Sequence, residues 1–307
     1  MAGIFIFSED SALAQQLMTP ALELKQSLVE PITALAVSEP DAKKLVSLGA
    51  DKAVVMQGNS WVEGLAEAIY SQVNEAHGSV LLVGGTLRGK HVASYVSAKL
   101  NAGMTTDAKT LRTEGGKLIA ARVLYAGLAV CEEEVALPAV ATIRARTFVA
   151  PSTAATAGAI ETVAVVGEPR VTVDKVTPAS RSGVDITAAT KLVSAGRAFR
   201  KQEDLKIADD LASALKAEIA CTRGIAEDEH WLPIERYVGI SGQTVKPDLY
   251  LAVGLSGQVQ HIVGCRESKV IVAVNNDERA PIFEAADYGV VGDLYEVLPL
   301  LTAALRK

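Results

Sequence analysis

The short phrase Gly-x-Ser-Gly occurs twice in close succession, at 239–242 and again at 254–257. Each copy follows an apolar run and leads into polar residues. Glycines let backbone approach a ligand closely, and serine hydroxyls with neighbouring backbone N–H groups can hydrogen-bond phosphate oxygens. A tight strand-to-helix turn without any ligand explains one copy equally well. With two copies near two arginines, two interpretations stay open: ligand-free turns, or a site for a nucleotide that carries a diphosphate.

A hydrolase is the first alternative, because the nucleophile elbow of that class reads Gly-x-Ser-x-Gly. The fifth position here is Gln243 in one copy and Gln258 in the other. Glycine is required at that position, so the sequence disfavours a serine nucleophile.

His261 follows the second copy and is one of 4 histidines in the chain. The other histidines have neither metal-like nor triad-like spacing to it, so no metal site is expected. Two interpretations stay open: a partly buried histidine bonded to a carbonyl, or a donor aimed at a ligand atom that becomes negative. A flavin develops such charge when it is reduced, and a positioned imidazole near an arginine would stabilise it.

The elements that must position these residues are short apolar runs in the last third of the chain. We predict buried strands at 191–196, 217–222, 237–241, 249–256 and 269–275, and a helix over 202–216. In a parallel sheet, ligands collect at the carboxyl ends of the strands. Polar residues follow each predicted strand in turn: Arg197, Thr222 with Arg223, Ser241, Ser256, and Asn275 with Asp277.

The first half of the chain has the same rhythm of strands and helices. Apolar runs at 3–8, 32–38, 52–58 and 79–85 predict strands, and 61–74 and 87–100 have helical spacing. A Glu-Gly-Gly turn at 114–116 predicts a hairpin, and 139–146, 160–166 and 170–176 are expected to extend a β-rich second part of this domain. The Ser-, Thr-, Gly- and Pro-rich stretch 177–190 marks the boundary. The predicted fold class is α/β with two domains: a doubly wound N-terminal domain, 1–182, and a smaller parallel-sheet C-terminal domain, 183–307.

Composition excludes several function classes. The 307 residues are 49% hydrophobic and carry a net charge of −6, which offers no basic surface for nucleic acid or acidic lipid. Cys131, Cys221 and Cys265 lie far apart, so no zinc or iron–sulfur site is expected, and three reduced thiols fit a cytoplasmic protein. No apolar run reaches the roughly 18 residues that span a bilayer, and we expect no export leader at the first residues. We therefore expect a protein that is not an integral membrane protein.

Two charged segments allow simpler interpretations. The run Glu132–Glu134 is expected to be a solvated edge, with partner contact as the lesser alternative. Arg88 and Lys90 stand where a helix begins, and either bind an anion or lie at a plain exposed helix start.

The C-terminal third resembles a known family. The runs "GISGQTVKPDLYLAVGLSGQVQHIVG" and "KVIVAVNNDERAPIFEAADYGVVGDLYEVLPLL" are similar to the signature region of the electron transfer flavoprotein alpha subunit, the FixB-like family. The resemblance extends more weakly over the N-terminal domain. It implies one FAD, held in an extended form on the second domain.

The resemblance also implies roles for individual residues. Arg197, Thr222 and Arg223 would line the cofactor, with Arg223 against the isoalloxazine. The segment Val238, Gly239, Ile240 and Ser241 would place a hydroxyl near flavin N5. The diphosphate and flavin would be bound by Ser256, Gly257, Gln258, Val259, Gln260 and His261, with His261 near flavin O2. The ADP end would be held by Asn275, Asp293 and Leu294.

The implied activity is electron transfer without substrate chemistry of its own. The family pairs with a beta subunit in a heterodimer, which the N-terminal domain would contact. It accepts electrons from flavin dehydrogenases such as acyl-CoA dehydrogenases, in fatty acid or carnitine metabolism, and passes them to a quinone reductase or another acceptor through transient docking. Three alternatives remain: a flavin- or NAD-dependent oxidoreductase subunit with its own substrate, a bifurcating member of the family, and a nucleotide-sensing subunit without redox activity.

Overall fold

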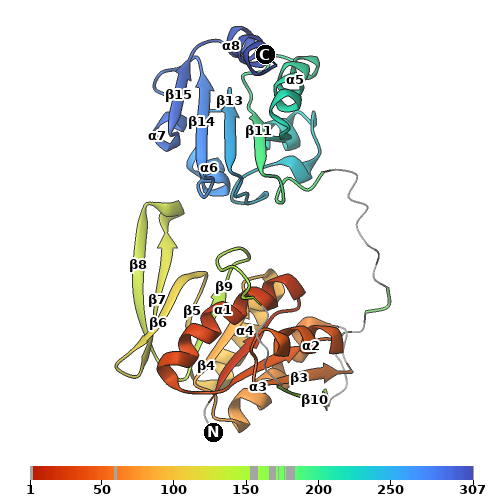
Figure 1. Ribbon diagram of the computed structural model, residues 1–307, viewed down its shortest axis with the longest axis vertical. Helices are drawn as coiled ribbons and strands as arrows, with labels where there is room; N and C mark the ends of the chain where they lie inside the picture. Colours follow the sequence, from red (N-terminus) through yellow and green to blue (C-terminus); the bar gives the residue numbers. More distant parts are fainter. Residues whose placement is uncertain are drawn as a thin grey trace. The chain divides into compact units, whose positions relative to one another are not determined.

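A computed structural model describes residues 3–58, 61–152, 158–165, 171, 173–175, 177 and 184–306. The chain divides into two compact units, Met1–Thr177 and Pro178–Lys307 (Figure 1). The expected boundary between residues 182 and 183 falls outside the described residues and stays a prediction. Ile186, only 1% exposed, already packs into the core of the second unit.

The first unit is built on a seven-stranded parallel sheet with the order β10-β3-β2-β1-β4-β9-β5. Its strands are β1 Ile4–Phe7, β2 Ile32–Ala36, β3 Lys52–Gln57, β4 Val80–Gly84, β5 Gly103–Thr105, β9 Ala139–Ile143 and β10 Ala159–Ala164. Its helices are α1 Ser11–Leu28, α2 Glu39–Ser47, α3 Ala66–Glu75 after the single turn η1 Val62–Leu65, and α4 Leu87–Leu100. The strands and helices predicted for this half up to residue 100 are confirmed.

Alternation along the strands assigns the helices to two layers. Ile4 and Ile6 pack with α1 and α2, whereas Phe5 and Phe7 pack with α3 and α4. All four side chains are at most 3% exposed. Because both faces of a parallel sheet are covered, its strands are apolar without interruption, and this is why they are visible in the sequence. The doubly wound prediction is therefore confirmed.

A separate three-stranded antiparallel sheet follows β5, with the order β6-β7-β8. It comprises β6 Ala108–Glu114, β7 Lys117–Leu124 and β8 Ala129–Ala136, with the short turn η2 Tyr125–Gly127 between the last two. Gly115 and Gly116 both have positive φ, +56° and +74°, as the predicted tight hairpin requires. The Glu132–Glu134 run lies on β8, where Glu132 and Glu134 are exposed and pair with Arg112 and Lys117 across the sheet.

Two expectations for the strands after residue 137 are wrong. The runs at 139–146 and 160–166 form β9 and β10, which join the main parallel sheet and do not extend a second β-rich part. An apolar run alone does not specify its partner strand. Of 170–176, the described residues 171 and 173–175 lie in no strand, and the rest of that run lies outside the described residues.

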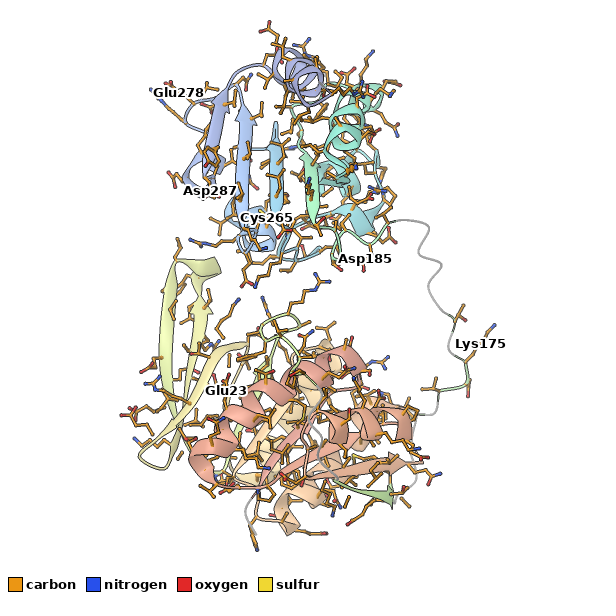
Figure 2. All side chains as sticks on the ribbon, viewed as in Figure 1. Glu23, Lys175, Asp185, Cys265, Glu278 and Asp287 are labelled. Carbon is orange, nitrogen blue, oxygen red and sulfur yellow. The ribbon has the colours of Figure 1, made fainter. Side chains whose placement is uncertain are left out.

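The second unit contains a five-stranded parallel sheet with the order β12-β11-β13-β14-β15. The strands are β11 Lys191–Ala195, β12 Glu218–Cys221, β13 Leu249–Val253, β14 Val270–Asn275 and β15 Tyr288–Val291. The helices are α5 Leu205–Leu215 after the turn η3 Gln202–Asp204, then α6 Val259–Cys265, α7 Ile282–Ala285 and α8 Leu294–Leu305. On β13, Tyr250 and Ala252 pack with α6, and Leu251 and Val253 pack with α5 and α8. Cys265 on α6 and Asp287 before β15 are labelled in Figure 2.

The strand predicted at 237–241 is wrong. The segment after the turns η4 Gly224–Asp228 and η5 Ile234–Arg236 forms only isolated bridges, because it curls back on itself. Gln243 N–H donates to the Tyr237 carbonyl at 2.7 Å, and Gly239 N–H donates to the Gln243 carbonyl at 3.2 Å. The fifth strand of the sheet is instead β15, whose sequence Tyr-Gly-Val-Val was not predicted as a strand.

The hairpin turn provides a test of the first unit. Nothing lies within 4 Å of the position of a Cβ at Gly115. Gly115→Ala therefore changes only the cost of the left-handed backbone, and we expect a loss of about 1 kcal/mol in the free energy of unfolding. Urea unfolding followed by Trp61 fluorescence in a Trp231→Phe background measures it. Gly115→Asn is the matched control, since asparagine tolerates this turn position; equal losses in both variants would contradict the turn assignment.

Candidate FAD site

A cavity of about 640 Å³ opens at the carboxyl ends of β11 to β14. Most residues that the sequence nominated line it: Arg197, Thr222, Arg223, Val238, Ile240, Ser241, Ser256, Gly257, Gln258, Gln260, His261 and Asn275. Parallel strands bring their carboxyl ends to one edge, so residues spread from 197 to 275 meet there. The size is that of a typical cofactor pocket.

A smaller hollow of about 190 Å³ adjoins the cavity and shares Ala198, Gly254 and Asn275 with it. Asp293 and Leu294 line this hollow, so they lie beside the predicted site but not in its main part. Asp293 is also the N-cap of α8, where its carboxylate accepts from Tyr295 N–H at 2.8 Å. Gly239 and Val259 are among the lining residues of neither hollow.

The second Gly-x-Ser-Gly turn leads directly into α6. Gly257 has φ +78°, and a Cβ there would come within 2.3 Å of the Ile282 backbone nitrogen, so only glycine fits. The N-cap residue of α6, Gln258, makes no side-chain hydrogen bond to the helix. The uncapped first turn leaves backbone N–H groups available to an anion.

The first Gly-x-Ser-Gly turn is tied to the same helix. Ile240 N–H donates to the Gln260 carbonyl, and Val245 N–H donates to the Gly264 carbonyl, each at 2.8 Å. The Ser241 hydroxyl lies 2.8 Å from the Tyr237 hydroxyl. The two turns therefore form one continuous rim, although one ends in a loop and the other in a helix.

His261 is buried, at 8% exposure, and lies on the first turns of α6. Its Nε2 is 2.8 Å from the Tyr250 hydroxyl, and the Val238 backbone also lies close to the ring. Burial lowers the pKa of His261 to about 4, and the Val238 backbone opposes this shift only in part. The imidazole is therefore neutral near pH 7.

Among the described residues, two buried polar atoms of the cavity lining make no hydrogen bond, His261 Nδ1 and Thr222 Oγ1. Each such atom costs free energy when it stays unpaired. A polar ligand in the cavity would satisfy both atoms. The donor set thus fits a flavin nucleotide, whose ring edges and diphosphate are rich in acceptors.

The two arginines of the site lie at its exposed rim. Arg223 pairs with Glu227 one helical turn along, and this hydrogen bond raises the pKa of the guanidinium. Arg197 is exposed beside it. Asn275 lines both hollows, and its Nδ2 donates to the Leu255 carbonyl at 2.9 Å while its Oδ1 accepts from Asp277 N–H. Its side chain therefore holds the turn before the second serine.

Sequence reasoning missed Tyr237 and Tyr250. Tyr237 lines the cavity beside Ser241, and Tyr250 lies beneath it against His261. A signal was available for Tyr250, because a tyrosine within a buried apolar strand needs a partner for its hydroxyl. No comparable signal marks Tyr237.

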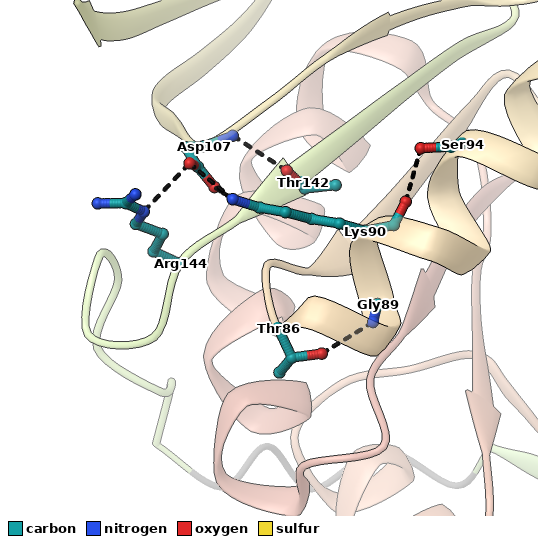
Figure 3. A network of polar contacts seen from close by, with 7 residues as sticks. All are labelled: Thr86, Gly89, Lys90, Ser94, Asp107, Thr142 and Arg144. Carbon is teal, nitrogen blue, oxygen red and sulfur yellow. Dashed lines mark hydrogen bonds and ion pairs between the residues drawn. The ribbon is translucent and has the colours of Figure 1, made fainter. Parts of the chain in front are cut away.

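The cations at the α4 start of the first unit are engaged internally. Figure 3 shows Lys90 and Arg144 converging on Asp107, with nitrogen to oxygen distances of 2.8 and 3.1 Å. Thr86 caps α4 by accepting from Gly89 N–H at 2.8 Å. Arg88 is exposed, with its Nε 3.9 Å from the nearest Glu63 oxygen. Of the two interpretations, an exposed helix start fits Arg88. Lys90 is half-buried, and the Asp107 carboxylate balances its charge.

Comparisons with known proteins agree with this geometry. Residues 185–266 match the electron transfer flavoprotein FAD-binding domain, and residues 9–167 match the electron transfer flavoprotein domain. Protein FixB of Escherichia coli O6:K15:H31 (strain 536 / UPEC) is 38% identical over 313 residues, covering 99% of this chain and 98% of the relative. Protein FixB of Escherichia coli O157:H7 and that of Shigella flexneri have the same identity and coverage.

The chain belongs to the electron transfer flavoprotein alpha subunit family. Its cofactor is FAD, as the resemblance of the C-terminal sequence implied. FAD supplies the redox chemistry, because its isoalloxazine ring accepts and releases electrons. Within the described residues, no group of His, Cys, Asp and Glu side chains could hold a metal ion, and no helix is long and apolar enough to cross a bilayer.

The burial of His261 generates a pH prediction. The folded pKa is depressed, so the unfolded chain binds the proton more readily, and stability is lost as pH falls from about 6.5 towards 4. Between pH 7 and pH 5 we expect the flavin-free second unit to lose about 2 kcal/mol more than a His261→Gln variant. Urea unfolding followed by Trp231 fluorescence in a Trp61→Phe background measures this difference. Identical pH profiles for the two proteins would show that His261 is not buried as described.

Proposed function

We propose that this chain carries electrons between other flavoproteins and has no organic substrate of its own. The observation that supports this proposal is the makeup of the cavity wall. His261 is the histidine of that wall, and its low pKa makes it a poor proton donor or acceptor near pH 7. The remaining groups around it bind and orient a nucleotide.

We propose the following placement of FAD. The Ser256–His261 segment binds the diphosphate and the flavin edge, Ser241 lies near flavin N5, and Arg223 lies against the ring. Thr222 and Arg197 line the same wall. The adjoining hollow at Asp293 and Leu294 takes the ADP end, with Asn275 acting through the turn that it holds. The backbone of four further residues supports this arrangement: Val238, Gly239, Ile240 and Val259.

The partners follow from the family assignment. We propose a heterodimer with an electron transfer flavoprotein beta subunit, contacted by the first unit. The donors are acyl-CoA dehydrogenase-type flavoenzymes of fatty acid or carnitine metabolism, and the acceptor is a quinone reductase or an equivalent protein. Docking to both is transient, as a carrier requires. We propose the cytoplasm as the compartment, which agrees with the free thiols of Cys131, Cys221 and Cys265.

The co-expressed complex of the two subunits provides the first test. We expect the purified complex to show flavin absorption bands, and to be reduced by a dehydrogenase only when that enzyme has its own substrate. Visible absorption spectra recorded with and without the dehydrogenase measure both properties. A complex without flavin bands would leave the nucleotide-sensing alternative. Turnover of a small substrate by the complex alone would favour an oxidoreductase.

The second test concerns Arg223 and His261. A cation and an N–H donor at the ring stabilise the negative charge that reduction adds. Arg223→Ala and His261→Ala are therefore each expected to lower the midpoint potential of the bound flavin in a redox titration.

Lys206→Ala is the matched control for the arginine variant. Lys206 lies on α5 and forms an exposed ion pair with Asp210 one turn along, as Arg223 does with Glu227, but it is not among the cavity-lining residues. Its loss should leave the potential unchanged. Unchanged potentials in both site variants would refute the assigned roles, and loss of FAD would indicate binding in place of tuning.

A further inference from the structure

Tyr250 is a fully buried tyrosine, the second residue of β13, and its hydroxyl contacts the cavity-lining His261. Its exposure is 0%, and its ring packs in the core between the sheet and α6. A buried hydroxyl without a partner is costly, so its hydrogen bonding is constrained. The partner in the structure is His261 Nε2, at 2.8 Å.

The direction of this hydrogen bond can be argued from the surrounding groups. Burial, more than any neighbouring group, raises the pKa of Tyr250 well above its ordinary value, so the hydroxyl keeps its proton and must donate it. Ser194 lies beside it, but the Ser194 hydroxyl oxygen is not in hydrogen-bond geometry with any of the described residues. Cys265 donates its own S–H towards the Ile262 carbonyl, 3.6 Å away. Sulfur is a weak acceptor, so the lone pair of His261 Nε2, 2.8 Å away, is the strongest acceptor beside the phenol.

This arrangement leaves the histidine proton on the other ring nitrogen. Neutral imidazole carries one N–H and one lone pair, and the hydrogen bond at one nitrogen selects the tautomer. We infer that Tyr250 is a positioning residue that locks His261 as the Nδ1–H tautomer, so that the ring edge not held by the phenol is a hydrogen-bond donor. The buried Nδ1, which is left unsatisfied by the part of the chain that the structure describes, is the atom that this inference assigns to the flavin.

The inference rests on the proposed function, because it gives His261 a flavin atom to face. It extends that proposal by saying which nitrogen donates and what prevents the opposite tautomer. An Nε2–H imidazole would offer a lone pair to the flavin edge and would repel the negative charge of the reduced ring. The titratable groups in contact with His261 are Tyr250 and Cys265, and the charged or titratable groups that line the same cavity are Arg197, Arg223, Asp228, Tyr237 and Asp277.

The test reads the tautomer directly. The full-length chain, isotope-labelled at the histidine ring nitrogens and co-expressed with its partner subunit, is measured by NMR after removal of FAD. His261→Asn assigns the His261 signals. We expect a single neutral form with the proton on Nδ1. In Tyr250→Phe we expect the Nε2–H form to gain roughly ten-fold in population, the change that one hydrogen bond supports.

A flavin readout accompanies the NMR measurement. Tyr250→Phe with FAD bound is expected to shift the midpoint potential downward, with the same sign as His261→Ala and at unchanged flavin content. Tyr288→Phe is the matched control, since Tyr288 lies on β15 of the same unit but is 67% exposed. It should change neither the tautomer nor the potential.

Each outcome decides the inference. A wild-type spectrum with the proton on Nε2 overturns it without the need for any variant, which covers the case that Tyr250→Phe does not fold. An unchanged tautomer in folded Tyr250→Phe also overturns it, since the phenol would then be mere packing. Absence of flavin from the complex would refute the proposed function, whereas the tautomer of the flavin-free protein would still be measurable.

Discussion

The backbone hydrogen bond from Ile240 N–H to the Gln260 carbonyl joins the two Gly-x-Ser-Gly turns, and the geometry of the site depends on it. On its other side the same segment is held to β12, where Val238 N–H donates to the Cys221 carbonyl at 3.0 Å. A loop bonded on both sides has few alternative conformations. Ser241 and His261 therefore belong to one surface, although they come from a loop and from a helix.

The segment 237–241 is a loop where the sequence predicted a strand, and this difference affects the chemistry of the site. In a strand, the backbone N–H and C=O groups would hydrogen-bond to neighbouring strands, and the side chains would alternate between the two faces of the sheet. The curled segment instead satisfies its backbone locally and against α6, which turns the Ser241 side chain towards the cavity rim. Binding residues are often carried by loops that a rigid scaffold positions, and here the scaffold is the β12 end and α6.

Polarity is distributed unevenly around the cavity. The rim carries exposed charges that are partly balanced, such as Arg223 with Glu227. The floor carries buried neutral groups, namely the Thr222 hydroxyl and the His261 imidazole above Tyr250. Exposed ion pairs contribute little to stability, whereas buried unpaired atoms cost more. A ligand that hydrogen-bonds to the buried atoms of the floor therefore contributes most of the stabilisation. The exposed charges of the rim set the electrostatic potential around that ligand.

The sequence by itself determined the two α/β units, most of their strands and helices, the choice of FAD and the set of residues at one sheet edge. Apolar runs reveal strands that are covered on both faces, and strand ends reveal where their loops gather. Tertiary structure alone decided that 237–241 is a loop, that β9 and β10 return to the main sheet, that Asn275 holds a turn, and that Tyr250 meets His261. Each of these depends on which distant backbone or side chain completes a hydrogen bond, and local composition does not encode the identity of a distant partner.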